Sequence, residues 1–297
     1  MSDPRNTVGH ALVKDAKWLD AVADVFGKIV GGLYRLPGTR PLKDLLHGTW
    51  PLGHPLHPAV TDITVGAYTA MVLLDVLTLV AREPGLARAA DVVLLLGLAT
   101  SLVSALSGLT DWNETYGEER RNGMLHGLVM VAATAGFVVS LALRGGGQRE
   151  AAVVVAIVAW LVMLAGAYLG GEQVFGYGTQ VNRHAWTKPA AKWQRLEIRA
   201  ADLEDRTPAV ARTTQGLELM VAKVDGTIYA IANTCTHAGG PLAKGTWTGD
   251  DRCLIKCPWH GSRFSVKDGH AAAGPATFDA PAFEVRLADG MVEVRAR

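Results

Sequence analysis

Residues 151–170, "AAVVVAIVAWLVMLAGAYLG", decide the fold because they form a long apolar run without a charged side chain. A helix that crosses about 30 Å of hydrocarbon needs ~20 mostly apolar residues, so this run is long enough to span a membrane. A buried helix of a soluble protein would keep a polar outer face, which this run lacks. The sequence therefore predicts a transmembrane helix here.

Three earlier stretches, residues 60–81, 92–110 and 125–143, have the same composition. The breaks between the four stretches are short and polar, and each contains Gly or Pro with charges that suit the headgroup region. A hydrophobic share of 49% agrees with a chain that lies partly in lipid. We therefore predict an antiparallel bundle of four transmembrane helices.

Residues 14–34, upstream of the spans, have apolar side chains at helical spacing on one side and Lys and Asp on the other. This pattern predicts an amphipathic helix. It either lies in the membrane interface or docks on the soluble domain, and the sequence does not choose between these placements.

After residue 186 the pattern changes to the alternation of short strands, with Asp-Gly turns at 225–226, 268–269 and 289–290. We predict a small all-β domain that begins near Pro189. The predicted fold is thus a multidomain α + β chain, an N-terminal four-helix transmembrane bundle followed by a C-terminal all-β domain. Its expected parts are an N-terminal segment with the amphipathic helix (1–50), the bundle (51–186) and the β domain (189–297).

Charge and cysteine content exclude two classes of protein. The net charge of +1 is spread without a basic tract, so no nucleic-acid partner is expected. Three cysteines do not make a disulfide framework. Cys253 alternates in phase with Ile255 and Cys257, which predicts a thiol in the core of the β domain.

Two short stretches of the β domain each place a cysteine close to a histidine: Cys235-x-His237 and Cys257-x-x-His260. Zinc sites with two cysteines and two histidines usually carry the histidines together on a helix. Here each Gly/Pro-rich loop supplies one thiolate and one imidazole, which indicates a different kind of metal centre.

The stretches "CTHAGGPL" (235–242) and "CPWHGSRF" (257–264), followed by "KDG" and "GPAT", resemble the Rieske family over residues 190–297. The resemblance implies a 2Fe-2S cluster in which Cys235 and Cys257 bind one iron and His237 and His260 bind the other. Because imidazole is neutral, the histidine-bound iron accepts an electron more readily than a thiolate-bound one. A zinc or purely structural site on the same scaffold is the alternative.

Departures from the respiratory Rieske pattern indicate which relatives are nearer. Gly240 and Trp259 stand where respiratory members carry two disulfide-linked cysteines. Ser262 keeps a hydroxyl that donates to the cluster in those members, whereas Phe264 lacks the tyrosine hydroxyl. The resemblance therefore points to the ferredoxin and oxygenase type, with a potential in the lower half of the range of roughly −150 to +300 mV.

The membrane part, residues 50–184, is similar to a bacterial family of uncharacterised four-helix membrane domains. The motifs are "GHPLHP" before the first span, "SGLTDW" after the second, "LHG" opening the third and "YLGGEQVFGYGTQV" closing the fourth. This resemblance implies no activity.

An even number of spans places the N-terminus, the middle loop and the β domain on one side of the membrane. That side carries more Lys and Arg than the other, where Arg82, Arg88, Arg144 and Arg149 lie. The positive-inside rule predicts a multi-pass protein of the inner or plasma membrane with a cytoplasmic Rieske domain. The basic residues on the predicted cytoplasmic side are Arg40, Lys43, Arg120, Arg121, Arg183, Lys188, Lys192 and Arg195.

Histidines gather on this same side. His57 and His126 begin two different spans, so we expect them to bind haem b from opposite faces or to border a bound quinone. His54 and His184 are expected to make capping or headgroup contacts. Asp75, within the first span, is expected to reach water or a polar partner near the far face, with a proton pathway as the alternative.

These observations predict a membrane-anchored Rieske electron-transfer protein, a component of an oxidoreductase system. It would pass single electrons between a cytoplasmic reductase or ferredoxin and a membrane acceptor, either haem or quinone, with lipid around the bundle. The alternative is a membrane-tethered redox or oxygen sensor whose bundle is only an anchor. An oxygenase would need a mononuclear iron site with two histidines and a carboxylate. We expect no separate soluble catalytic domain that could hold such a site.

Overall fold

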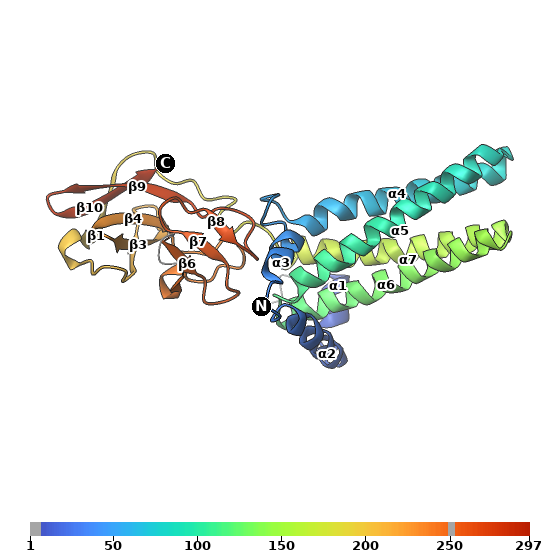
Figure 1. Cartoon of the computed structure of the whole chain (residues 1–297), viewed down its shortest axis with the longest axis horizontal. Coiled ribbons are helices and arrows are strands. Elements are labelled where there is room, and N and C mark those ends of the chain that lie inside the picture. Colours follow the sequence, from blue (N-terminus) through green and yellow to red (C-terminus); the bar gives the residue numbers. More distant parts are fainter. Residues whose placement is uncertain (1–6, 249–252) are drawn as a thin grey trace. The chain divides into compact units, whose positions relative to one another are not determined.

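The computed structural model describes residues 7–248 and 253–297, which form two compact units (Figure 1). The helical unit comprises Met1–Pro41 and Leu56–Thr179, and the β unit comprises Leu42–Pro55 and Gln180–Arg297. The predicted domain boundaries stay predictions, but this grouping adds a feature that they lack. Leu42–Pro55, which precedes the first span, belongs with the β unit. The first six residues of the predicted N-terminal segment lie outside the described part of the chain.

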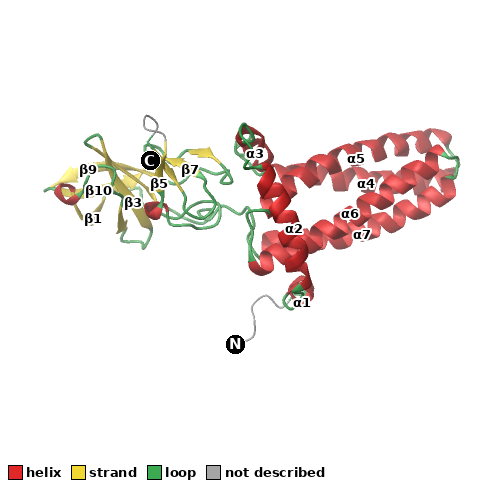
Figure 2. Cartoon of the chain, turned by 60° about the horizontal axis from the view of Figure 1, so that its bottom comes forward, coloured by secondary structure: helices red, strands yellow, loops and turns green. Residues whose placement is uncertain are grey.

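Four long helices occupy the predicted spans: α4 (Leu56–Ala81), α5 (Pro84–Trp112), α6 (Gly117–Gly145) and α7 (Arg149–Phe175). Among the described residues these are the helices long and apolar enough to cross a membrane. Helix α4 packs along α5 and α6 packs along α7, so the bundle consists of two helical hairpins (Figure 2). The predicted bundle of four membrane helices is confirmed.

Small residues allow close packing inside the bundle. The rings of Tyr68 and Phe137 stack with their centroids 3.7 Å apart. A Cβ atom at Gly97 would lie 2.7 Å from the Tyr68 ring, and one at Gly136 would lie 2.8 Å from the side chain of Ala159. Membrane helices associate by such close van der Waals contact, because lipid provides no hydrophobic driving force between them.

The segment before the bundle forms α1 (Val8–Val13), α2 (Trp18–Leu33) and α3 (Arg40–His47). Helix α2 packs on α6. Arg121 donates two hydrogen bonds of 2.8 Å to Asp20, and Arg120 donates one of 3.0 Å to Asp24. The predicted amphipathic helix therefore docks on the bundle and leaves an apolar row exposed, which favours the membrane interface over the soluble domain. The exposed row contains Trp18, Val25, Phe26, Ile29 and Leu33.

Four charged side chains, one from each long helix, form an ion-pair cluster where α4 ends and α7 begins. Asp75 is fully buried and accepts hydrogen bonds from Arg144 and, at 2.8 Å, from Arg149. Asp91 accepts from the same two arginines at 2.7 and 2.5 Å. The expected polar partner of Asp75 is therefore a pair of guanidinium groups.

Two antiparallel sheets make up the described part of the β unit, one six-stranded with the order β1-β10-β9-β4-β3-β2 and one four-stranded with the order β5-β6-β7-β8. Asp225-Gly226 and Asp289-Gly290 have positive φ angles and make the tight turns of the hairpins β3–β4 and β9–β10. The strands are β1 (Gln194–Arg199), β2 (Ala209–Arg212), β3 (Glu218–Val224), β4 (Thr227–Ala232), β5 (Thr246–Thr248), β6 (Leu254–Lys256), β7 (Arg263–Ser265), β8 (Ala271–Ala273), β9 (Ala282–Ala288) and β10 (Met291–Ala296).

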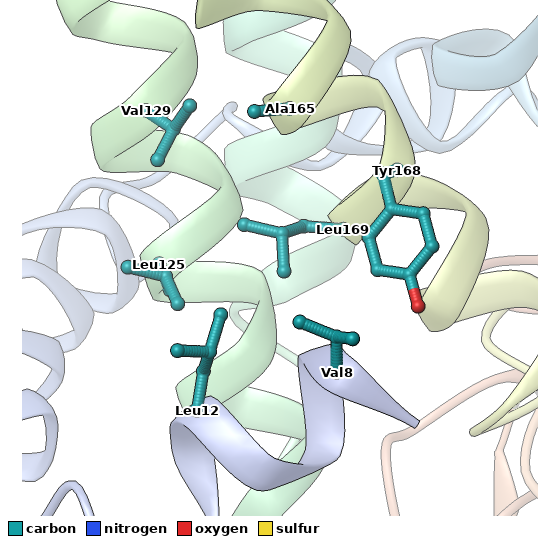
Figure 3. Close-up of a pocket in the computed structure, with 7 residues that line it drawn as sticks. All are labelled: Val8, Leu12, Leu125, Val129, Ala165, Tyr168 and Leu169. Carbon is teal, nitrogen blue, oxygen red and sulfur yellow. The ribbon is translucent and has the colours of Figure 1, made fainter.

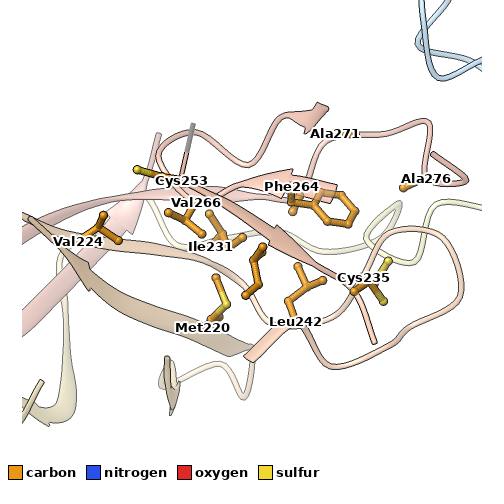
Figure 4. Packing of buried hydrophobic residues seen from close by; sticks show 13 residues of the cluster. Met220, Val224, Ile231, Cys235, Leu242, Cys253, Phe264, Val266, Ala271 and Ala276 are labelled. Carbon is orange, nitrogen blue, oxygen red and sulfur yellow. The ribbon is translucent and has the colours of Figure 1, made fainter. Parts of the chain in front are cut away.

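A buried apolar core reaches from the strands to the predicted metal site (Figure 4). It contains Ile231, Leu242 and Phe264 together with the thiols of Cys235 and Cys257. Cys253 is also buried in this core, as its alternation phase predicts. The site is thus built on the rigid, closely packed end of the β unit.

Candidate metal centre

Two loops of the β unit hold the predicted ligands, and they repeat the same backbone pattern. In the first loop (residues 233–242, after β4) the Cys235 N–H donates to the Gly240 carbonyl at 2.8 Å, and Gly239 N–H donates back to the Cys235 carbonyl. In the second loop (residues 257–262, between β6 and β7) Cys257 and Ser262 make the matching bond at 2.8 Å. Gly239 and Gly261 have φ angles of +89° and +78°, which favour glycine at these turns.

The two thiols lie against each other at the centre of these loops. Cys235 donates a hydrogen bond to the Cys257 sulfur, which lowers the pKa of Cys257 to about 6, with help from the N–H groups of Trp259 and His260. The same thiol–thiol bond, together with burial, raises the pKa of Cys235. Cys257 is therefore the easier of the two thiols to deprotonate, and backbone N–H groups point at its sulfur as they would at a metal-bound thiolate.

The two histidines also meet. The rings of His237 and His260 lie 5.0 Å apart, centroid to centroid, with their planes at 86°. Burial, and to a smaller extent the positive charges of His260, His47, Arg183 and Lys43, together lower the pKa of His237 to about 3. The Nδ1 atom of His237 is buried and has no hydrogen-bond partner in the described structure. A neutral imidazole with an unpartnered buried nitrogen is suited to bind a metal ion.

The space around the sulfurs supports the same conclusion. A Cβ atom at Gly240 would lie 2.8 Å from the Cys257 sulfur, so the glycine keeps room beside it. Within residues 7–248 and 253–297, no three or more His, Cys, Asp or Glu side chains lie close enough together to hold a single metal ion. A Rieske cluster takes two protein ligands per iron. Two cysteines and two histidines on paired loops fit such a cluster.

A third loop, which contains the "GPAT" stretch 274–277, packs behind the second loop. Ser262 is fully buried, and its Oγ accepts a hydrogen bond of 2.9 Å from the Ala276 N–H. Because that bond uses an oxygen lone pair, the Ser262 hydroxyl proton stays available for another acceptor. This geometry is compatible with the donor role that the resemblance implies for Ser262.

Leu42–Pro55 packs on this third loop. Asp44 accepts a hydrogen bond of 3.0 Å from the Gly274 N–H, and the Thr49 hydroxyl donates one of 3.0 Å to the Ala276 carbonyl. The ring of His54 makes an edge contact with Phe278. His54 Nδ1 also hydrogen bonds at 3.0 Å to the Pro55 carbonyl, just before α4 begins, so the expected capping or headgroup contact stays a prediction beside this ring contact.

The linker after α7 packs on the first loop. His184 is nearly buried, and its Nε2 hydrogen bonds to the Thr234 carbonyl at 2.7 Å. Burial lowers the pKa of His184, and the bond to Thr234 opposes this shift in part. The Arg183 N–H donates to the Thr236 carbonyl at 3.2 Å. The expected capping or headgroup role of His184 is replaced by support of the loop that carries Cys235.

In the helical unit, the structure brings together the two histidines predicted to contact a membrane cofactor. The rings of His57 on α4 and His126 on α6 lie 6.3 Å apart with their planes at 84°. Each Nδ1 atom hydrogen bonds at 2.8 Å to a backbone carbonyl, that of Ser104 for His57 and that of Gly166 for His126. The described residues offer no hydrogen-bond partner to either Nε2 atom.

An apolar groove lies between α1 and the pair α6–α7 (Figure 3). Leu125, which precedes His126, and Leu169 line it together with Val8 and Leu12 of α1. The hydroxyl group of Tyr168 is the polar part of an otherwise apolar set of lining residues. The groove is formed within the helical unit alone.

Comparisons with known proteins assign the two units. The family described as "Rieske [2Fe-2S] domain" matches residues 193–284, and that described as "Predicted membrane protein (DUF2231)" matches residues 53–183. Ferredoxin CarAc of Metapseudomonas resinovorans is 36% identical over 95 residues, which cover 32% of this chain and 86% of that protein. The ferredoxin component of the naphthalene 1,2-dioxygenase system of Pseudomonas aeruginosa is 36% identical over 75 residues, 25% of this chain and 69% of that protein.

Among solved structures, the Sphingomonas yanoikuyae B1 ferredoxin is 29% identical with a TM-score of 0.33, covering 36% of this chain and all of that one. The family match over residues 193–284 and the two relatives that are 36% identical make the β unit an iron-sulfur domain of the Rieske type. The chain belongs to the Rieske [2Fe-2S] family, here joined to a DUF2231 membrane domain. The Rieske domain implies a 2Fe-2S cluster and a role in electron transfer.

Several contacts at this site carry no sequence signal. Asp44 and Thr49 are common residue types with no motif around them, and only the folded chain reveals that they hold the third loop.

The pairing of Asp75 with Arg144, in the helical unit, had a sequence signal, because the C-terminal ends of α4 and α6 fall on the same side of a four-span bundle. Opposite charges near that end could have been matched from the sequence.

Proposed function

We propose that this chain is a membrane-anchored electron-transfer protein whose cluster is held by Cys235 and Cys257 on one iron and by His237 and His260 on the other. The pairing of two like loops, with the buried Nδ1 atom of His237 left unpartnered, is the observation that carries this proposal. When bound, the cluster takes up and releases one electron at a time. The backbone N–H groups directed at Cys235 and Cys257 stabilise negative charge on these sulfurs.

We further propose that His57 and His126 bind the membrane acceptor, with haem b as the first choice. A metal-binding histidine usually donates its second ring nitrogen to a carbonyl, as both Nδ1 atoms can do here. The two rings come from different helices and their centroids lie 6.3 Å apart, so His57 and His126 could together hold a haem iron, which would supply a second one-electron carrier. A quinone beside His126, with its tail in the apolar groove, is the alternative acceptor.

The proposed orientation places the Rieske domain in the cytoplasm, where a soluble reductase or ferredoxin would be its partner. Basic residues are more numerous at that face. Arg144 and Arg149 at the other face are paired with Asp75 and Asp91. The ferredoxin relatives of dioxygenase systems support a partner that is itself an oxidoreductase component.

Purified full-length protein in detergent tests these proposals by iron and acid-labile sulfide analysis, with absorption and EPR spectra. We expect two irons and two sulfides per chain beside any haem iron, and loss of the cluster in His260→Ala and Cys257→Ala. One zinc without sulfide would overturn the cluster. His57→Ala and His126→Ala should remove haem or quinone while the Rieske spectrum stays. If wild-type protein binds neither, and both variants still pass electrons to membrane acceptors, the bundle is an anchor and the sensor function gains support.

A further inference from the structure

The second loop carries an exposed aromatic side chain near its middle. Trp259 is 50% exposed and follows the exposed Pro258, and its ring centroid lies 6.5 Å from that of His260. The first loop differs, because the linker residues Arg183 and His184 bond to its backbone. Of the two loops, the second is therefore the one that presents an apolar side chain to a partner.

Two basic residues flank the second loop in sequence, Lys256 directly before it and Arg263 directly after it. Lys256 and Arg263 are direct cross-strand partners of β6 and β7. Their neighbours Ile255 and Phe264 form the adjacent pair and are buried in the core, so Lys256 and Arg263 point to the outer face of the sheet. Lys244 is exposed and precedes β5, the strand that pairs with β6. We call Lys244, Lys256 and Arg263 the basic patch.

Within residues 7–248 and 253–297, the basic patch has no acidic partner. None of its three side chains forms an ion pair with another residue that the structure describes. The Nε atom of Arg263 is buried and has no hydrogen-bond partner there. Like charges that face each other across two strands destabilise a sheet. Their presence next to an exposed tryptophan indicates a surface that meets negative charge from outside.

We propose that Trp259 and the basic patch form the docking surface for an acidic, soluble one-electron carrier protein; this rests on the proposed function. Tryptophan is a frequent anchor of protein interfaces. Unpaired cationic charges accelerate association with an anionic partner and orient it. An anionic lipid surface is a poorer fit, because one tryptophan and one proline offer much less apolar area than interfacial membrane elements use. In the exchange, the carrier is oxidised by one electron and the cluster is reduced by one.

Binding of flavodoxin, an acidic one-electron carrier, tests this surface on the full chain in phosphatidylcholine nanodiscs by surface plasmon resonance. We expect the double variant K256E/R263E to weaken binding at least about tenfold and to remove the loss of affinity that added salt causes in the wild-type protein. Trp259→Ala should weaken binding about tenfold as well. Lys192→Glu, next to β1 of the other sheet, is a charge-reversal control with half that change in net charge, and it should stay within about twofold. The variant K256Q/R263Q removes the two charges without reversing them. Its EPR spectrum shows whether the second loop still holds the cluster, which separates an effect of lost charge from an effect of a damaged loop.

Flavodoxin binding by K256E/R263E at the wild-type strength, with a full cluster present, would overturn the docking surface and leave the proposed function standing. Wild-type binding to phosphatidylserine vesicles through the same residues, without binding to flavodoxin, would likewise overturn it in favour of a membrane contact. Absence of iron and sulfide from the wild-type protein would overturn the proposed function, and the binding measurement would be unaffected by that failure.

Discussion

Ser262 is placed to tune the cluster through a single hydroxyl group. Its Oγ accepts from Ala276, which leaves the proton to donate toward the sulfurs of the centre. We predict that Ser262→Ala lowers the midpoint potential by on the order of tens of millivolts, because a lost donor destabilises the more negative reduced state. A redox titration followed by EPR measures this. Ser265→Ala, at the end of β7, is the control, and an unchanged potential in Ser262→Ala would contradict the donor role.

Phe264 is the second residue at which we expect one hydroxyl group, here an added one, to change the midpoint potential. Its ring is fully buried in the core that contains Cys235 and Cys257. We predict that Phe264→Tyr raises the midpoint potential by on the order of tens of millivolts, since a phenol donor favours the extra negative charge on a nearby sulfur. Phe283→Tyr, in the other core of the β unit, should not change it. A decrease, or no change with the hydroxyl shown in contact, would contradict this account.

The linker 180–188 is the element whose attachment to the first loop depends on pH. Burial lowers the folded-state pKa of His184, so the folded linker binds a proton less readily than the unfolded one, whose pKa is about 6.5. Its attachment is therefore strongest above about pH 6.5 and weakens as the pH falls below that value. Hydrogen exchange at the Arg183 amide, corrected for intrinsic rates, should show protection falling from pH 8 to pH 5. A His184→Asn variant should lack this pH dependence, and equal protection across the range in wild-type protein would contradict the prediction.

Elements with long or repeated patterns could be predicted from the sequence. The four spans follow from apolar runs, and the two ligand loops follow from Cys-His spacing together with Gly and Pro. The docking of Leu42–Pro55 on the third loop could not be predicted. Its side-chain hydrogen bonds come from Asp44 and Thr49, which lie more than two hundred residues from their partners. Contacts between distant, common polar residues leave no local pattern in one sequence.

At the scale of the whole molecule, the ion-pair cluster at the far end of the bundle joins both helical hairpins. Asp75 is fully buried, and Arg144 is 3% exposed. We predict that Asp75→Asn lowers the stability of the bundle by about 3–5 kcal/mol, because it leaves buried guanidinium groups without their main partner. Steric-trapping unfolding in bicelles measures this change, while the Rieske EPR signal should stay unchanged.

A charge-compensating double variant tests whether the lost stability comes from the unpaired charge. Asp75→Asn combined with Arg149→Gln removes one charge of each sign and should recover part of the lost stability, since the remaining Arg144 keeps Asp91 as its partner. If the double variant is as unstable as the sum of the two single variants, the pairing of Asp75 with Arg149 contributes nothing and the prediction fails.

The same cluster has a consequence for biogenesis. The hairpin made of α4 and α5 carries both carboxylates, Asp75 and Asp91, and the hairpin made of α6 and α7 carries both guanidinium groups, Arg144 and Arg149. During synthesis the first hairpin leaves the ribosome before its counter-charges exist, and a charge held in lipid is costly. We therefore expect the first hairpin to reach its full stability in the membrane only after the second one is inserted. A chain truncated after α5 would expose the unmatched carboxylates, which makes it a recognisable substrate for the proteases that clear orphaned membrane segments.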